Sequence, residues 1–172
     1  MEREFVMRKW IRFLLAAGLF AGLLTTAHAG PYVGASWGAY QIEESDLDDN
    51  DDLWKAYVGG QINDLFGIEG SWVDFSRAGT GVSSFEGDGW GLSAILSFPA
   101  GPTSSLFVKA GQFWWDSESV LGGIVRSSDG NDPFFGAGFR WGAGLALRVE
   151  WERYDVADID FNTYTIGLQL GF

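Results

Sequence analysis

Apolar and polar residues alternate with a period of two along most of the chain from residue 31 onward. This period is the one expected of β-strands, and no segment in this region has the helical period. The alternation predicts eight strands, at 31–42, 53–62, 67–75, 89–98, 105–116, 134–141, 145–154 and 162–172. Short connections at 63–66, 99–104 and 142–144 alternate with long ones at 43–52, 76–88, 117–133 and 155–161. We therefore expect an all-β, antiparallel up-and-down barrel with its long loops at one end.

The two faces of these strands differ in chemistry. One face carries aliphatic and aromatic residues, whereas the other is rich in glycine and serine with a few charged side chains. A soluble ligand-binding barrel turns its apolar face inward and its polar face to water, where glycine weakens a strand and packs against nothing. A glycine-rich polar face instead fits the cramped interior of an eight-stranded transmembrane barrel. The pattern therefore favours a transmembrane barrel, with the soluble barrel as an alternative.

Large aromatic residues on the apolar face lie near the ends of the predicted strands. They are Trp54, Trp72, Trp90, Phe98, Trp114, Trp141, Trp151 and Phe172. Aromatic side chains collect at the two interfaces between a membrane and water. This placement supports the transmembrane interpretation.

The beginning of the chain has the features of a secretory signal peptide. A basic region precedes the apolar run 13–24, and residues 27–29 offer a small-residue cleavage site. The run is too short for a transmembrane helix. We expect residues 1–29 to be removed and residues 30–172 to form one barrel domain. Translation is expected to start at Met7, because the residues before it would place two acids in the basic region.

The composition excludes several classes of function. The 172 residues contain no cysteine and carry a net charge of −12, so disulfides and thiolate metal sites are absent and nucleic acid is repelled. The only histidine, His28, lies in the signal peptide, which leaves no histidine to act as a general base. We expect no enzyme activity, no cofactor and no catalytic or metal site.

The first long connection, 43–52, is strongly acidic, with seven carboxylates. Calcium-binding loops of the EF-hand type also require a glycine at the sixth position and a distal bidentate glutamate, and both are missing here. We expect a solvated acidic loop, with weak association of divalent cations as the alternative. The other long connections are acidic too, which predicts a negative outer surface.

The chain ends in an alternating strand that stops on an aromatic residue. Thr165, Gly167, Leu170 and Phe172 resemble the C-terminal signal that outer-membrane barrels present to the barrel-assembly machinery. The segment 148–154, with its Arg-x-Glu-aromatic core, and the Phe-Gly-Ala-Gly-Phe-Arg segment at 135–140 add to the resemblance. With the strand pattern, these features make residues 30–172 similar to the OmpA-type eight-stranded outer-membrane β-barrel.

The resemblance carries several expectations. It implies an integral protein of the outer membrane of Gram-negative bacteria, in contact with lipid and lipopolysaccharide, and we expect a monomer. OmpA proper continues into a peptidoglycan-binding domain, whereas this chain stops at Phe172, so tethering to the cell wall is not inferred. In the OmpA family an acidic residue of the third strand exchanges between basic partners as a gate. Glu69 occupies such a position, with Lys109 and Arg148 or Arg140 as its expected partners.

Charged residues on the polar face are the remaining candidates for function. They are Lys55, Glu69, Lys109, Arg140, Arg148, Glu150 and Glu152. Charges in a narrow interior have to pair, and the near balance of sign predicts an ion-pair network that plugs the lumen. The first hypothesis is a structural protein or one that contacts an external partner through its acidic loops. The alternative is a narrow gated pore for ions or small solutes.

Overall fold

The computed structural model describes residues 29–42, 51–78, 83–121, 124–156 and 159–172. Residues 1–28 of the expected signal peptide and residues 43–50 of the acidic loop lie outside these ranges. No helix long and apolar enough to cross a membrane occurs in the described ranges.

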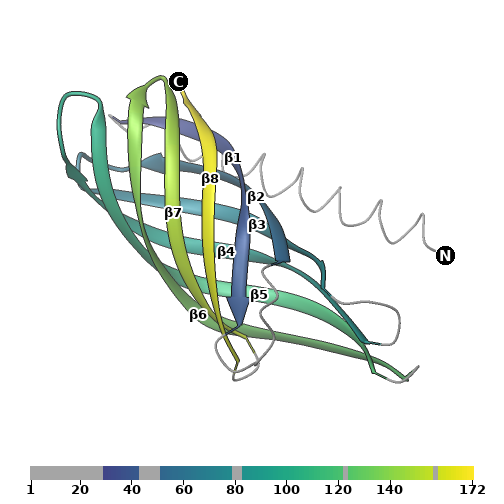
Figure 1. Cartoon of the computed structure of the whole chain (residues 1–172). Helices are drawn as coiled ribbons and strands as arrows, with labels where there is room; N and C mark the ends of the chain where they lie inside the picture. The colour runs from purple at the N-terminus through teal and green to yellow at the C-terminus, as the bar shows by residue number, and fades with distance from the viewer. Residues whose placement is uncertain (1–28, 43–50, 79–82, 122–123, 157–158) are drawn as a thin grey trace.

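Eight strands form a single closed barrel (Figure 1). They are β1 (Ala29–Ile42), β2 (Asp51–Gln61), β3 (Phe66–Ala78), β4 (Ser83–Pro99), β5 (Ser104–Leu121), β6 (Ile124–Ala143), β7 (Leu145–Val156) and β8 (Ile159–Gly171). Each strand pairs antiparallel with its neighbours in sequence, and β1 closes the barrel by pairing with β8. The predicted all-β up-and-down barrel is confirmed, and the C-terminus lies at the end of the short turns.

The strands are longer than the sequence predicted at the end opposite the short turns. The predicted loop 117–133 is mostly strand, since β5 runs to Leu121 and β6 begins at Ile124; the predicted loop 76–88 is shortened in the same way. The ladder continues here through polar residues because backbone hydrogen bonds need no apolar side chains. Figure 1 shows the β5–β6 hairpin reaching farther than its neighbours. The hydrophobic pattern therefore marked the membrane band rather than the full strands.

The apolar face points outward. Trp141 and Leu168 have exposed fractions of 60% and 56%, whereas Lys55 and Glu69 are 1% and 0% exposed. A soluble barrel with an apolar interior lining is the opposite arrangement, so that alternative does not describe this fold. The outward aliphatic side chains instead suit contact with lipid tails.

Trp54, Phe98, Trp141 and Phe172 lie near strand ends as predicted, whereas three other tryptophans lie inside their strands, at the edge of the apolar band. Trp72, Trp90 and Trp114 occupy directly opposed register positions on β3, β4 and β5, well inside these strands. Phe98 lies near the short-turn edge of the same band on β4. The segment from Trp90 to Phe98 spans about 20 Å along the membrane normal for a strand tilted by about 40°. This height approaches that of an outer-membrane barrel's apolar belt.

Glycines on the inner face make room for large side chains. A Cβ atom on Gly34 would lie 2.3 Å from the ring of Tyr57, and one on Gly138 would lie 2.3 Å from the ring of Phe107. At these distances the added Cβ atom would clash with the ring, so the ring would have to move from its place. The glycine-rich face is therefore needed for the side chains opposite it.

Candidate functional site

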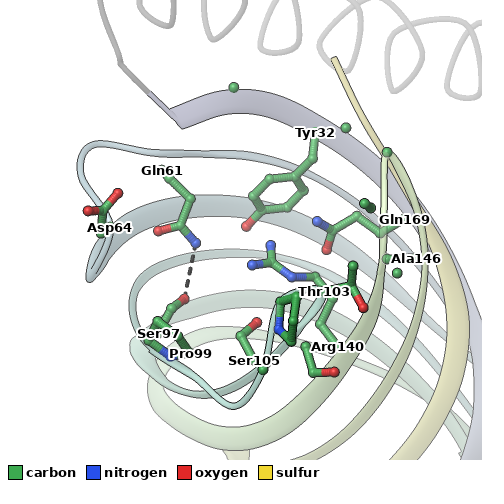
Figure 2. Close-up of a pocket in the computed structure, with 18 of the residues that line it drawn as sticks. Tyr32, Gln61, Asp64, Ser97, Pro99, Thr103, Ser105, Arg140, Ala146 and Gln169 are labelled. Carbon is green, nitrogen blue, oxygen red and sulfur yellow. Dashed lines mark hydrogen bonds between the residues drawn. The ribbon is translucent and has the colours of Figure 1, made fainter.

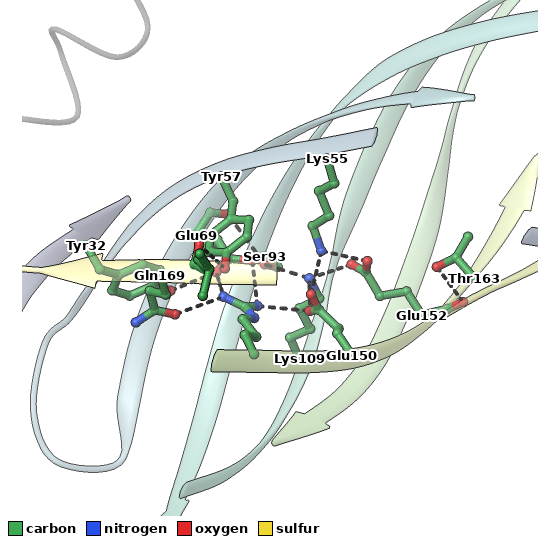
Figure 3. Close-up of polar contacts among 12 residues, drawn as sticks. Tyr32, Lys55, Tyr57, Glu69, Ser93, Lys109, Glu150, Glu152, Thr163 and Gln169 are labelled. Atoms are coloured by element: carbon green, nitrogen blue, oxygen red, sulfur yellow. Dashed lines mark hydrogen bonds and ion pairs between the residues drawn. The ribbon is translucent and has the colours of Figure 1, made fainter. Parts of the chain in front are cut away.

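The centre of the lumen holds a buried network of charged side chains from β2, β3, β5 and β7 (Figure 3). Its members are Lys55, Glu69, Lys109, Arg148, Glu150 and Glu152, each no more than 3% exposed. Alternation of the strands turns all of them inward, and the antiparallel register brings them to similar heights. The structure thus joins six of the seven predicted lumenal charges in one cluster.

Glu69 is the acceptor at the short-turn side of the network. Its carboxylate accepts hydrogen bonds from Arg148 Nη1 at 2.5 Å and Nη2 at 3.0 Å, which is a two-point contact. Lys109 Nζ donates to Glu69 Oε1 at 3.3 Å, and the Tyr32 hydroxyl donates to Oε2 at 2.9 Å. Of the three basic partners expected for Glu69, Lys109 and Arg148 therefore contact it, and Arg140 does not.

The second half of the network joins two lysines to two glutamates. Lys55 Nζ lies 2.8 Å from Glu150 Oε2 and 2.6 Å from Glu152 Oε2. Lys109 Nζ lies 2.5 Å from Glu150 Oε1 and also pairs with Glu152. Arg148 Nη2 donates to Glu150 Oε1 at 2.9 Å and thereby links this half to Glu69. Each carboxylate serves at least two cations, so the cluster acts as one unit.

Arg140 does not join the network, which corrects the prediction that included it. It is half-buried near the short-turn end of β6, and the described residues give it no ion pair or hydrogen bond. In the β6–β7 register it stands directly opposite Arg148. Two guanidinium groups at that spacing repel each other, and Glu69 is already engaged by Arg148.

A buried aromatic cluster fills the lumen on the loop side of the charges, and the sequence analysis missed it. It consists of Tyr40, Leu53, Val73, Phe75, Phe113, Trp115, Phe134, Tyr154 and Phe161. Phe134 stacks on Tyr154 with ring centroids 5.0 Å apart, and Phe113 meets Tyr154 edge-on at 4.8 Å. The signal was present as adjacent aromatic pairs at 114–115 and 134–135, where one member faces lipid and the other must face inward.

The residues of the predicted assembly signal fall on both faces of β8. Thr165 is buried in the lumen, whereas Leu170 and Phe172 are 50% and 69% exposed on the outer surface. A Cβ on Gly167 would lie 2.2 Å from the Ala35 carbonyl oxygen, so only glycine fits against β1 there. Recognition of these residues by assembly machinery remains a prediction.

The described ranges hold no group of three or more histidine or acidic side chains that could bind a metal ion. The expected absence of a metal site is untested for the acidic loop, because residues 43–50 lie outside those ranges. The sequence predicted no pair of nucleophile and general base suited to acyl transfer. In the structure, lysine and arginine side chains pair with the buried carboxylates. The arrangement is that of a filled, ion-paired interior.

Solved structures of bacterial outer-membrane proteins share this fold. Neisserial surface protein A is 18% identical with a TM-score of 0.67, and the match covers 83% of this chain and 97% of that one. Ail of Yersinia pestis is 17% identical with a TM-score of 0.63, covering 84% and 97%. The N-terminal barrel domain of Pseudomonas aeruginosa OprF is 15% identical with a TM-score of 0.64, covering 84% and 100%. The curated proteins include no match.

At these identities the likeness establishes the fold, and the family follows from the sequence itself. Residues 13–172 match the family described as the outer membrane protein beta-barrel domain. The match spans all eight strands and agrees with the outward apolar band and the closed antiparallel topology. The chain therefore belongs to the outer membrane protein beta-barrel domain family.

Proposed function

We propose that this protein is a closed, non-conducting outer-membrane barrel with a structural or surface-interaction role. The single observation that carries the proposal is the filling of the lumen by two successive layers, the charge network and the aromatic cluster. An eight-stranded barrel is just wide enough for side chains to fill it. Two filled layers in series favour a closed lumen, and the alternative of a gated pore would require both layers to move.

The outer rim supports a surface role. Trp72, Trp90 and Trp114 form a row across β3 to β5, here called the tryptophan row. On its loop side, four aspartates occupy directly opposed positions on β3 to β6: Asp74, Asp88, Asp116 and Asp129. Ail has been solved in complex with the heparin analogue sucrose octasulfate. This chain carries a net charge of −12, which opposes a polyanion of that kind. We therefore propose that the acidic rim binds a cationic external partner, or lipopolysaccharide through bridging divalent cations. We also propose that the barrel-assembly machinery inserts the protein, which then remains a monomer.

Electrical recording tests the closed lumen. Purified barrel reconstituted in planar bilayers is expected to show no steady current above that of bilayers treated with protein-free detergent. A single substitution in the aromatic layer, Phe113→Ala, should leave the current unchanged because the ion-paired layer still closes the lumen. A large, steady conductance in the unmodified protein would overturn the plug and favour the pore.

The expected removal of the signal peptide gives a second prediction. Export should remove residues 1–29, because residues 27 and 29 are alanines that suit the small pockets of a signal peptidase. The intact mass of protein purified from outer membranes is then that of the chain beginning at Gly30. A mass that retains the apolar run 13–24 would contradict this division.

A further inference from the structure

The short-turn end of the lumen opens into a cavity of about 550 Å³ that the charge network does not fill. Figure 2 shows its polar lining, to which Tyr32, Gln61, Ser105, Arg140 and Gln169 contribute. The Arg140 guanidinium lies near the middle of this ring of side chains. Short turns face the periplasm in outer-membrane barrels. The cavity is thus a vestibule that solutes of the periplasm can enter.

The numbers of basic and acidic side chains in this part of the lumen differ, and the difference makes the vestibule positively charged. Between the aromatic cluster and the short turns, four basic side chains, Lys55, Lys109, Arg140 and Arg148, face three acidic ones, Glu69, Glu150 and Glu152. The three glutamates are engaged by the two lysines and Arg148. The excess positive charge is therefore that of Arg140. Asp64, the acidic side chain of the lining, is exposed on the turn at the rim, and the terminal carboxylate of Phe172 also lies at this end of the barrel; neither makes an ion pair with Arg140 in the described ranges.

Unused hydrogen-bonding groups surround this charge. Ser105 is 6% exposed, and its hydroxyl has no partner in the described part of the chain. Gln61 donates to Ser97 Oγ at 3.0 Å, but no described residue donates to its buried Oε1. The side-chain carbonyl oxygen of Gln169 accepts a hydrogen bond from Arg148 Nη1 at 3.4 Å, which leaves the amide N–H groups of Gln169 for another acceptor. Buried polar atoms without protein partners are costly, so such groups beside an unpaired arginine suit a polar ligand in the vestibule.

We propose that the vestibule binds a small monovalent carboxylate, with Arg140 as its counter-charge. A guanidinium fork matches the two oxygens of a carboxylate, and the Ser105 hydroxyl and the Gln169 amide supply further donors. A monoanion neutralises the single excess charge, whereas a dianion such as hydrogen phosphate would introduce a repulsive charge near Glu69. Gln61 Oε1 can accept a hydrogen bond from a donor elsewhere on the ligand.

Titration of the folded barrel tests the site directly. Nitrogen-15-labelled protein in detergent micelles is titrated with sodium acetate at constant ionic strength, and the backbone amide shifts of Gln61, Ser105 and Gln169 are followed. We expect saturable shifts with a dissociation constant in the millimolar range, at least tenfold weaker binding in Arg140→Gln, and intermediate binding in Arg140→Lys, which keeps the charge but loses the fork.

The matched control is Arg153→Gln, which removes an arginine paired with Asp160 near the opposite end of β7. Its acetate binding should equal that of the unmodified protein. Unchanged binding in Arg140→Gln, or shifts that never saturate, would overturn the site. Equal shifts with sodium chloride, or tighter binding of hydrogen phosphate, would overturn the assignment to a monovalent carboxylate. The readout does not depend on whether the lumen conducts.

Discussion

Glu69→Ala is expected to lower the free energy of unfolding of the barrel by about 3–5 kcal/mol, the usual cost of removing one partner from a buried ion pair. The substitution leaves Arg148 without its two-point acceptor, removes a contact of Lys109 and deprives the Tyr32 hydroxyl of its acceptor. Denaturant or thermal unfolding followed by the gel shift of folded barrel measures the loss. High salt should change it little, since the pair is buried and poorly screened.

Two comparisons separate the network from a general effect of losing a carboxylate. Asp155→Ala removes an exposed acid and should change stability by no more than about 0.5 kcal/mol. The double substitution Glu69→Leu with Arg148→Met keeps the net lumenal charge and replaces a buried pair by apolar contacts, so it should recover much of the lost stability. A Glu69→Ala protein as stable as the Asp155→Ala protein would show that the network does not support the barrel.

The conductance of Glu69→Ala should stay near baseline, because the aromatic cluster still closes the loop side of the lumen. Combining it with Phe113→Ala weakens both layers and is expected to open a measurable current. Current in Glu69→Ala alone would mean that the charge network is the only seal.

Phe172→Asp is expected to reduce insertion into the outer membrane several-fold in cells. Phe172 is 69% exposed at the end of the final strand, and its backbone N–H donates to the Pro31 carbonyl oxygen at 3.1 Å, a bond that the substitution keeps. The folded barrel therefore loses little when this side chain changes. The loss should come from failed recognition of the terminal aromatic by the assembly machinery. The amount of folded, heat-modifiable protein in outer-membrane fractions measures it.

The matched control is Phe98→Asp, which places the same charge at the same edge of the apolar band on β4. Charges near the interface cost only about 0–1 kcal/mol, so its insertion should fall much less. Phe172→Asp should also refold normally into detergent micelles, where no machinery takes part. If insertion in cells falls equally for the two variants, the effect comes from a charge at the edge of the membrane, and the assembly-signal hypothesis is wrong.

The number, order and facing of the strands could be predicted from the sequence, because a strand between lipid and a narrow lumen has to alternate in chemistry along its whole length. The same alternation identified the six charged side chains of the network and Arg140 before their contacts were known. It did not locate the strand ends beyond the tryptophan row. Past the membrane both faces of a hairpin are polar, and the alternation no longer distinguishes strand from loop.

The sequence by itself determined which charged side chains enter the membrane-spanning part of the lumen, and only the tertiary structure decided which of them meet. Partners such as Glu69 and Arg148 are far apart in the chain, and their contact depends on the register of four strands and on the closure of β1 against β8. The same register set Arg140 opposite Arg148 and outside the network, because the height of a side chain in the barrel depends on strand pairing and tilt rather than on its chemistry. It also gathered aromatic residues from β1, β3, β5, β6, β7 and β8 into one inner layer, since inward positions at one height converge on the axis of a closed barrel.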